Sequence, residues 1–275
     1  MPELPEVETL RRTLALHLVG RRIVEVNVVV LKMLSAPAGD PDAFSQIILG
    51  HRIDKISRRG KHLIFDLDMG YHLLFHLKMR GQIVVVPHEA EVEKYHALTL
   101  VFDSGFDLRF YDIWTWGAFG AVTGDALSEH PALTAMGAEP LDDSFTDVVL
   151  KGALAKRSRT TIKAAILDQS VVAGVGNIYA DESLFRSGIR PDRKVGDLAS
   201  EEITKLTRSI RAVLLDATGD GGTASDNYVD ADGIVGRYHP QVYDRAGKPC
   251  DVCGEQLSRI KVAGRGTVFC PSCQK

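Results

Sequence analysis

The sequence predicts an α+β protein: an N-terminal β-sandwich domain with flanking helices, then a helical domain and a small cysteine module. Residues 52–123 are mostly short β-rich runs separated by turns, whereas the chain after residue 150 has helical periodicity. All four cysteines lie at or after position 250. Few periodic runs occur near 125–150, so we place a domain boundary there. The predicted parts are residues 1–130, a linker 131–150, a helical domain 151–241 and a cysteine hairpin 242–275.

The first domain begins with a predicted helix over residues 7–19, which ends at Gly20. Asp40 and Pro41 have the pattern of a helix cap followed by proline at the first helical position, and Gly50 ends that short helix. The predicted strands are residues 22–28, 63–67, 82–86, 98–102 and 108–111. Two packed sheets would bury the apolar faces of such strands.

The second domain is predicted to be helical. One helix begins at residues 153–154, and the others cover residues 162–167, 181–186 and 200–217. In the last of these, Ile203, Leu206, Ile210 and Leu214 recur at helical spacing and should face inward.

The cysteines have the spacing C-x2-C-x16-C-x2-C, formed by Cys250, Cys253, Cys270 and Cys273. Two such pairs can surround one tetrahedral ion, and four thiolates leave no open position, so we predict one structural Zn²⁺. The alternative is two disulfides, which a reducing compartment disfavours.

Composition is that of an ordinary soluble protein, with 45% hydrophobic and 25% charged residues. No apolar run is long enough to span a bilayer and the N-terminus is no secretory signal, so we expect a cytoplasmic protein without a membrane partner. The net charge of −3 argues weakly against a polyanionic partner. However, basic residues cluster at 58–61, 156–159 and 245–275. Each cluster could be a solvated face, but together with a zinc module they favour nucleic-acid binding.

The first residues suggest amine chemistry. If Met1 is removed, Pro2 becomes a secondary amine that can attack an electrophilic sugar carbon and hold it as an iminium. The adjacent Glu3 could move the protons that this reaction requires. The alternative is an ordinary leader before a helix.

Several motifs occur in a characteristic order: Pro2-Glu3-Leu4-Pro5-Glu6, Gly60-Lys61, the segment 168–179 with Gly174-Val175-Gly176-Asn177, and the four cysteines. Over its whole length, the chain resembles the formamidopyrimidine-DNA glycosylases (Fpg, or MutM), relatives of endonuclease VIII. The resemblance implies a helix-two-turn-helix domain before the zinc hairpin. It also implies a monomeric, bacterial-type base-excision repair enzyme of the nucleoid that binds damaged double-stranded DNA.

The resemblance further implies the reaction. The enzyme would flip out and remove oxidised bases, namely formamidopyrimidines and possibly 8-oxoguanine, and then cleave the abasic site by β,δ-elimination. Pro2 would attack C1′ to form a Schiff base, and Glu3 would protonate the deoxyribose. Lys61 would act in β-elimination and Arg265 in δ-elimination, and Glu6 would support the site. Glu6 could instead simply suit the helix dipole, and Lys61 could be a solvated charge.

By the same resemblance, seven residues are expected to contact DNA: Met79, His96, Trp114, Trp116, Arg159, Lys163 and Asn177. His96 could equally be a core histidine, and Arg159 a solvated charge. Met79 and Trp116 match side chains that fill the space left by the flipped base.

The sequence departs from the family at two sites. Trp114 stands where the family has an arginine that reads the base opposite the lesion, and an indole has one donor and no charge. Asp226 lies in the lesion-capping loop where a basic residue is often found. Cytosine preference is therefore in doubt, and 8-oxoguanine could be a poor substrate. The alternatives are a glycosylase shifted toward oxidised pyrimidines or abasic sites, and a non-catalytic zinc-containing DNA-binding protein.

Overall fold

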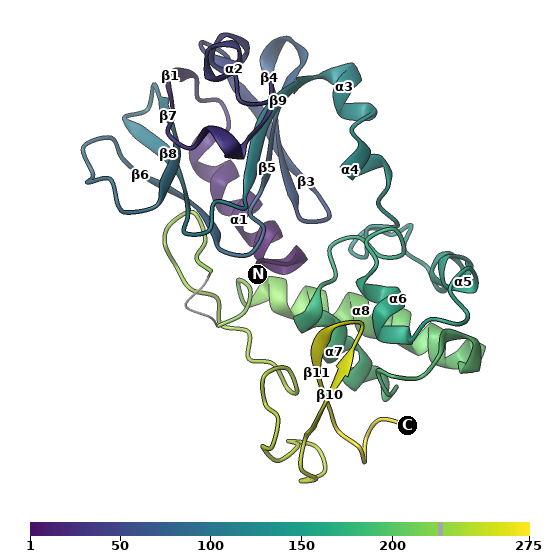
Figure 1. Cartoon of the computed structure of the whole chain (residues 1–275). Helices are drawn as coiled ribbons and strands as arrows, with labels where there is room; N and C mark the ends of the chain where they lie inside the picture. The colour runs from purple at the N-terminus through teal and green to yellow at the C-terminus, as the bar shows by residue number, and fades with distance from the viewer. Residues whose placement is uncertain (225–227) are drawn as a thin grey trace. The chain divides into compact units, whose positions relative to one another are not determined.

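The computed structural model describes residues 1–224 and 228–275, which form two compact units. The first unit comprises Met1–Thr134 and Asp220–Arg237, and the second comprises Ala135–Gly219 and Tyr238–Lys275. Strands dominate the first unit, and helices with one β-hairpin form the second (Figure 1). The predicted α+β class is confirmed.

Two sheets form the framework of the first unit. The four-stranded sheet is antiparallel and has the order β1 (Ile23–Val28), β7 (His96–Phe102), β8 (Phe106–Asp112), β6 (Gly81–Pro87). The five-stranded sheet has the order β2 (Leu34–Ala36), β9 (Ala118–Thr123), β5 (Tyr71–His76), β4 (His62–Leu67), β3 (Ile53–Arg59). Only its β2–β9 pair is parallel among the described strand pairs.

Helix α1 (Leu4–Leu18) packs between these sheets against β3, β4 and β6 (Figure 1). The four apolar residues spaced along its inner face are fully buried: Val7, Leu10, Leu14 and Leu18. The helix begins three residues earlier than predicted because proline is tolerated in the first turn, where its missing N–H has no helical partner. After the helix, Gly20 adopts a φ of 84° that favours glycine.

The remaining helices of the first unit are short. Helix α2 (Pro41–Ile48) begins as predicted, because the Asp40 carboxylate accepts a hydrogen bond of 3.0 Å from the Ala43 N–H. The others are η1 (Leu31–Met33), η2 (Asp68–Gly70), α3 (Gly124–Ser128) and α4 (Pro131–Thr134).

The second unit contains α5 (Asp147–Ala155), α6 (Ile162–Leu167), α7 (Asn177–Ser187), η3 (Val195–Asp197), α8 (Ser200–Gly219) and the hairpin β10 (Ser258–Val262) and β11 (Arg265–Phe269). Helix α7 packs against α8 on one side and β11 on another. Leu206, Ile210 and Leu214 of α8 are buried as predicted, whereas Ile203 is half-buried.

One predicted boundary in this unit is wrong. The sequence predicted a helix start at residues 153–154, but helix α5 ends there, at Ala155. It begins at Asp147 because Thr146 caps it by accepting a 3.3 Å hydrogen bond from the Val149 N–H. Across the described residues, no helix has the length and apolarity needed to cross a bilayer.

Candidate active site and nucleic-acid contacts

The first candidate site is the start of the chain. Pro2 and Glu3 are buried immediately before helix α1, and Glu3 is only 1% exposed. Lys61, which is 8% exposed, follows Gly60 in the tight turn between β3 and β4. Gly60 has a φ of 54°, which favours glycine at this turn. The fold therefore gathers Pro2, Glu3 and Lys61 from two distant stretches of sequence.

The electrostatics of the terminal amine support this grouping. Burial lowers the pKa of the N-terminal amine below its ordinary value. The charges of Glu3 and Glu6 oppose this effect, while those of Lys61 and Arg80 add to it. This amine belongs to Met1, and the charges of Glu3, Glu6, Lys61 and Arg80 therefore lie within electrostatic reach of the chain start.

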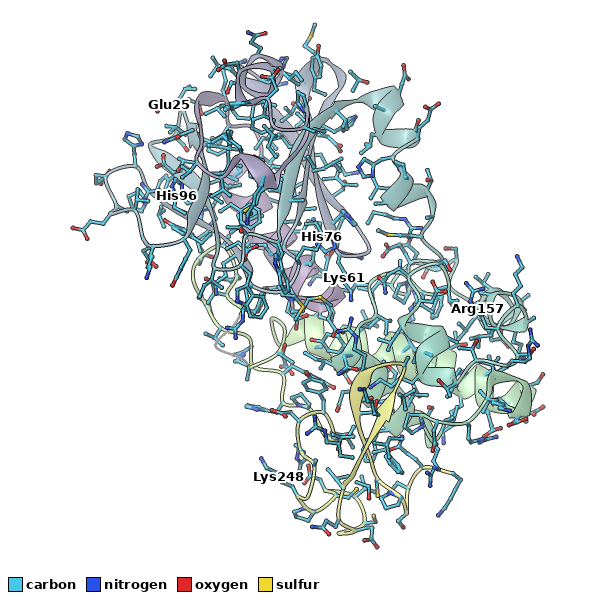
Figure 2. The ribbon with its side chains drawn as sticks, in the orientation of Figure 1. Glu25, Lys61, His76, His96, Arg157 and Lys248 are labelled. Carbon is cyan, nitrogen blue, oxygen red and sulfur yellow. The ribbon has the colours of Figure 1, made fainter. Side chains whose placement is uncertain are left out.

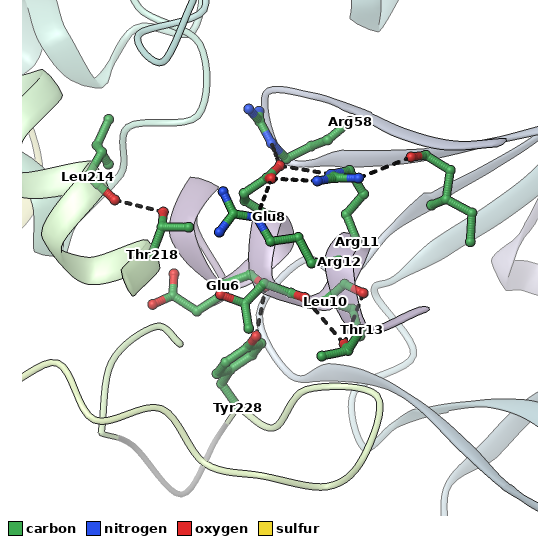
Figure 3. Close-up of polar contacts among 12 residues, drawn as sticks. Glu6, Glu8, Leu10, Arg11, Arg12, Thr13, Arg58, Leu214, Thr218 and Tyr228 are labelled. Atoms are coloured by element: carbon green, nitrogen blue, oxygen red, sulfur yellow. Dashed lines mark hydrogen bonds and ion pairs between the residues drawn. The ribbon is translucent and has the colours of Figure 1, made fainter. Parts of the chain in front are cut away.

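Glu6 is the structural centre of this region, being only 1% exposed. Its Oε2 accepts a 2.9 Å hydrogen bond from the Glu3 N–H, as in a capping box. Its Oε1 accepts two further bonds of 2.8 Å from the Thr223 N–H and hydroxyl. The Tyr228 hydroxyl donates to the Glu6 carbonyl oxygen at 2.8 Å (Figure 3). Glu6 thus ties the N-terminal residues to Thr223 and Tyr228, which lie in the predicted lesion-capping loop.

The predicted role of Asp226 in that loop lies outside the described residues. Thr223, which the sequence did not single out, is the residue of this loop whose N–H and hydroxyl bond to Glu6. No periodic or motif signal near Thr223 indicates this contact.

On the next turn of α1, Glu8 holds three arginines. Its carboxylate accepts hydrogen bonds from Arg11 at 2.8 Å, Arg12 at 2.8 Å and Arg58 at 3.3 Å (Figure 3). Burial opposes ionisation, but the bonds from Arg11 and Arg12 outweigh it and lower the pKa of Glu8 to about 2. Arg58, one of the predicted basic cluster, is therefore a buried structural cation as well.

Two histidines adjoin Lys61 on strands β4 and β5. The His62 and His76 rings contact edge to face with centroids 4.4 Å apart. Burial, followed by the charge of Lys78, lowers the pKa of His62 to about 4. Burial, followed by the neighbouring charges, lowers that of His76 to about 2. Nδ1 of His76 also accepts a 3.0 Å hydrogen bond from the Lys78 N–H, which requires that nitrogen to be unprotonated.

The loop after β8 carries the two predicted aromatic DNA contacts. Trp114 is 40% and Trp116 is 59% exposed, so neither packs in the core. Their ring centroids lie 4.8 Å apart. Met79, the third residue of this group, lies half-buried in the turn between β5 and β6. These three residues all belong to the first unit.

His96, at the start of β7, is half-buried (Figure 2). Its Nε2 lies 2.7 Å from the Thr99 hydroxyl, and its ring is 5.6 Å from that of Tyr111. Burial lowers the pKa of His96, which favours the neutral ring. A neutral imidazole can donate to phosphate through one nitrogen only.

In the second unit, Arg159 and Arg265 are exposed, so both can reach a ligand. Asn177 begins α7, directly after the glycine turn, and its amide nitrogen donates a 3.1 Å hydrogen bond to the Gly266 carbonyl. This bond connects the turn to hairpin residue 266, next to Arg265. The N–H groups at a helix start also favour phosphate.

Lys163 does not fit its predicted DNA contact. The side chain is 0% exposed, and its ammonium lies 2.6 Å from the Asp181 carboxylate and 2.8 Å from the Thr267 hydroxyl. Burial raises the pKa of Asp181 to about 6, against the effect of Lys163. Lys163 therefore stabilises the packing of α6 and α7 on the hairpin. The otherwise apolar sequence of α6 was a signal for this burial.

The four cysteines converge at the base of the hairpin. Their sulfur atoms all lie within 4.8 Å of one another, with Cys250–Cys273 at 4.0 Å and Cys253–Cys270 at 3.5 Å. These distances exceed a disulfide bond of about 2.05 Å. Four sulfurs placed about 2.3 Å from a tetrahedral zinc would be about 3.8 Å apart, so this donor set fits the metal.

Comparison with known proteins extends these observations to the whole chain. Residues 1–119 match the formamidopyrimidine-DNA glycosylase N-terminal domain, and residues 136–228 match the formamidopyrimidine-DNA glycosylase H2TH domain. Residues 247–275 match the zinc finger found in FPG and IleRS.

Known formamidopyrimidine-DNA glycosylases are similar to this chain over its full length. The formamidopyrimidine-DNA glycosylase of Desulfitobacterium hafniense is 42% identical over 277 residues, covering 100% of both chains. Wild-type Lactococcus lactis Fpg (MutM), solved with DNA containing N7-benzyl-Fapy-dG, has a TM-score of 0.92 at 34% identity and 100% coverage of both chains. The same wild-type protein, solved with DNA containing an oxidised pyrimidine, has a TM-score of 0.91 with the same identity and coverage.

Fold, site and matches define a DNA glycosylase with a zinc-finger module. The chain belongs to the formamidopyrimidine-DNA glycosylase family, which confirms the resemblance seen in the sequence.

Proposed function

We propose that this protein is a base-excision repair enzyme that removes oxidised bases, formamidopyrimidines in particular, from duplex DNA and cleaves the resulting abasic site. The observation that carries the proposal is the joint burial of Pro2, Glu3 and Lys61 at the start of a chain of this family, where the charges of Glu3 and Lys61 act on the Met1 amine. A protein that only bound DNA would have no need of such a site. Damaged double-stranded DNA is the partner, as it is for the solved relatives.

Removal of Met1 gives Pro2, which is buried, a free secondary amine. Its lone pair attacks C1′ of the flipped nucleotide, and the C1′–N glycosidic bond breaks, releasing the base. The departing base takes up the proton that the amine loses, and Glu3, as the neutral acid, donates its proton to the deoxyribose ring oxygen. The C1′–O4′ bond then breaks, the sugar opens, and the nitrogen and C1′ form an iminium. The iminium acidifies the C2′ hydrogen.

Elimination then cleaves the strand. Loss of the C2′ proton expels the 3′ phosphate, and a second elimination expels the 5′ phosphate. We assign proton transfer and phosphate contact in the first step to Lys61, and phosphate contact in the second step to exposed Arg265. The product is a one-nucleotide gap with a phosphate at each end. Glu6 holds Glu3 through the 2.9 Å bond to the Glu3 N–H.

DNA contact is divided between the two units. We propose that Met79, Trp114 and Trp116 occupy the space left by the flipped nucleotide, and that His96 contacts the backbone. In the second unit, Arg159 and Asn177 would bind phosphate. The exposure of Trp114, Trp116 and Arg159 supports these assignments.

One structural zinc ion, held by Cys250, Cys253, Cys270 and Cys273, would fix the hairpin that carries Arg265. We also propose that the enzyme acts as a monomer in the bacterial cytoplasm, at the nucleoid where its substrate lies. The domain bounds 1–130, 131–150, 151–241 and 242–275 remain our prediction.

A second candidate is a related glycosylase with a shifted lesion preference. Exposed Trp114 in place of an arginine is the observation that favours it. Oxidised pyrimidines or abasic sites would then be processed better than 8-oxoguanine.

Borohydride trapping tests the main proposal. With an oxidised-base duplex, the processed enzyme should leave a covalent protein–DNA adduct, and Pro2→Gly should leave none while still binding. Absence of an adduct with the wild-type protein would favour a non-catalytic DNA-binding protein. Single-turnover excision of several lesions, each opposite all four bases, separates the first candidate from the second.

A further inference from the structure

The loop that carries the two tryptophans is held in one conformation by a buried carboxylate. Asp112 is 1% exposed and accepts three backbone hydrogen bonds, from Trp114 at 2.9 Å, Trp116 at 2.9 Å and Gly117 at 2.6 Å. A Cβ at Gly117 would lie 2.7 Å from the Phe110 ring, so the chain can turn there only with glycine. The fixed backbone of this loop therefore places both indole side chains toward solvent.

A cation lies against this loop. Arg80 ends the turn between β5 and β6, and its guanidinium carbon lies 5.4 Å from the ring centroid of Trp114. Gly81 fixes that turn, because a Cβ there would lie 2.5 Å from the Leu77 carbonyl oxygen. Arg80 is exposed, and such contact with an aromatic face orients a guanidinium.

Arg80 also lies within electrostatic reach of the amine site, since its charge contributes to the lowered pKa of the terminal amine. The residue is thus close both to the reacting end of the enzyme and to the aromatic loop. The sequence analysis missed Arg80, because nothing in its neighbourhood indicates a partner thirty-four positions away.

We propose that Arg80 and Trp114 act as one unit that reads the base opposite the lesion, with Trp114 stacking on DNA and Arg80 supplying the guanidinium that the tryptophan lacks. This inference rests on the proposed function and makes Arg80 a specificity-determining residue. A guanidinium edge offers two parallel donors. On the pairing edge of cytosine, two acceptors, O2 and N3, are adjacent, whereas no other base presents two adjacent acceptors there. Thymine alternates acceptor, donor and acceptor, guanine has one acceptor followed by two donors, and adenine has one donor beside one acceptor. The unit should therefore favour cytosine.

The test is single-turnover excision of a formamidopyrimidine opposite each of the four bases. The wild-type enzyme should prefer cytosine, and Arg80→Ala should reduce the cytosine-to-adenine rate ratio by roughly 5- to 100-fold, the range of a lost bidentate base contact. Arg80→Lys should recover only part of the lost rate ratio, because an ammonium lacks the two parallel, coplanar donors of a guanidinium. Trp114→Ala should also lower the ratio, and the double variant should lower it no further than Arg80→Ala.

Arg52→Ala is the matched control. It removes the same side-chain type from an exposed site of the same unit, where Arg52 pairs with Asp54 at 3.0 Å. Its rate ratio should equal that of the wild type. An unchanged ratio in Arg80→Ala, or a wild-type enzyme indifferent to the opposite base, would overturn the proposal.

A readout independent of catalysis separates this inference from the proposed function. The chain contains two tryptophans, both in this loop, so intrinsic fluorescence reports on it alone. Duplexes that carry a stable abasic-site analogue should quench the fluorescence when they bind. The dissociation constant from this titration should be lowest with cytosine opposite the analogue, and Arg80→Ala should remove that difference. If the wild-type protein forms no borohydride adduct but shows this pattern, the proposed function fails and the reading unit stands. If the wild-type protein forms the adduct but lacks this pattern, the reading unit fails and the proposed function stands.

Discussion

The carboxylate of Glu6 accepts hydrogen bonds of 2.8 Å from both the N–H and the hydroxyl of Thr223. Through its other oxygen the same carboxylate holds the N–H of Glu3. One buried side chain therefore couples the order of the segment at 223 to the position of the N-terminal residues.

Replacing Thr223 with valine should weaken this coupling. The hydroxyl bond to a buried carboxylate is lost, so we expect the free energy of unfolding to fall by about 1–2 kcal/mol and adduct formation to slow. Thr223→Ser keeps the hydroxyl and should behave like the wild type. Urea denaturation and the borohydride-trapping rate measure the two effects; equal values for the valine and serine variants would contradict the role of the hydroxyl.

Glu8→Gln should destabilise the first unit. The change leaves Arg11, Arg12 and Arg58 around a neutral group, and breaking a largely buried ionic cluster costs about 3 kcal/mol. Because the pKa of Glu8 is lowered to about 2, the carboxylate stabilises the fold above its unfolded pKa and loses this effect as the pH falls toward 2. In denaturation measured from pH 5 to pH 2, the free energy of unfolding of the variant should therefore fall less steeply than that of the wild type.

Acidification should also act through His62 and His76. Their folded pKa values, about 4 and about 2, are below the unfolded value, so between pH 6.5 and pH 4 the unfolded chain binds protons that the folded chain does not. Each histidine should lower the free energy of unfolding by up to about 1.4 kcal/mol per pH unit in that window. Urea titrations at pH 7, 6 and 5 would show this slope, and His76→Gln should reduce it.

Lys163→Met tests whether that lysine is structural. Removing the ammonium leaves Asp181 buried without its partner, so stability at pH 8 should fall by about 3–5 kcal/mol. The loss should shrink as the pH falls, and should do so already above pH 6. Burial raises the pKa of Asp181 to about 6 even beside Lys163, and loss of the ammonium raises that pKa further. Adding Asp181→Leu to Lys163→Met should restore much of the stability. A variant that is fully stable but weak in DNA binding would contradict the structural role.

Removing zinc should unfold the hairpin while sparing the first unit. Metal analysis should find one zinc per chain, and a chelator should release it with loss of DNA affinity. Cys270→Ser should reproduce the effect. Proteolysis within 247–275 after chelation would locate the change, and an unchanged cleavage pattern would argue against a structural ion.

Local patterns predicted those parts of the fold whose signal lies within a few residues. The pattern of residues 7–19 predicted α1, whose inner face is buried, and Asp40 predicted the start of α2. Strand β5 went unnoticed because its centre, Leu73 to Phe75, is buried without alternation.

The residues of the candidate site likewise differ in whether a local sequence pattern indicates them. Pro2, Glu3 and Lys61 could be found because the chemistry ties them to short motifs. Thr223 and Arg80 could not, since their partners are fixed only by tertiary packing.

The burial of Pro2 has a practical consequence for anyone preparing this protein. A purification tag fused to the N-terminus would turn the amine that we propose as the nucleophile into an amide and push extra chain into a packed region. The opposite end is the better place for a handle: Lys275 is exposed, although its carbonyl oxygen accepts hydrogen bonds from Arg190 and Arg193. A short spacer after Lys275 would keep those bonds undisturbed.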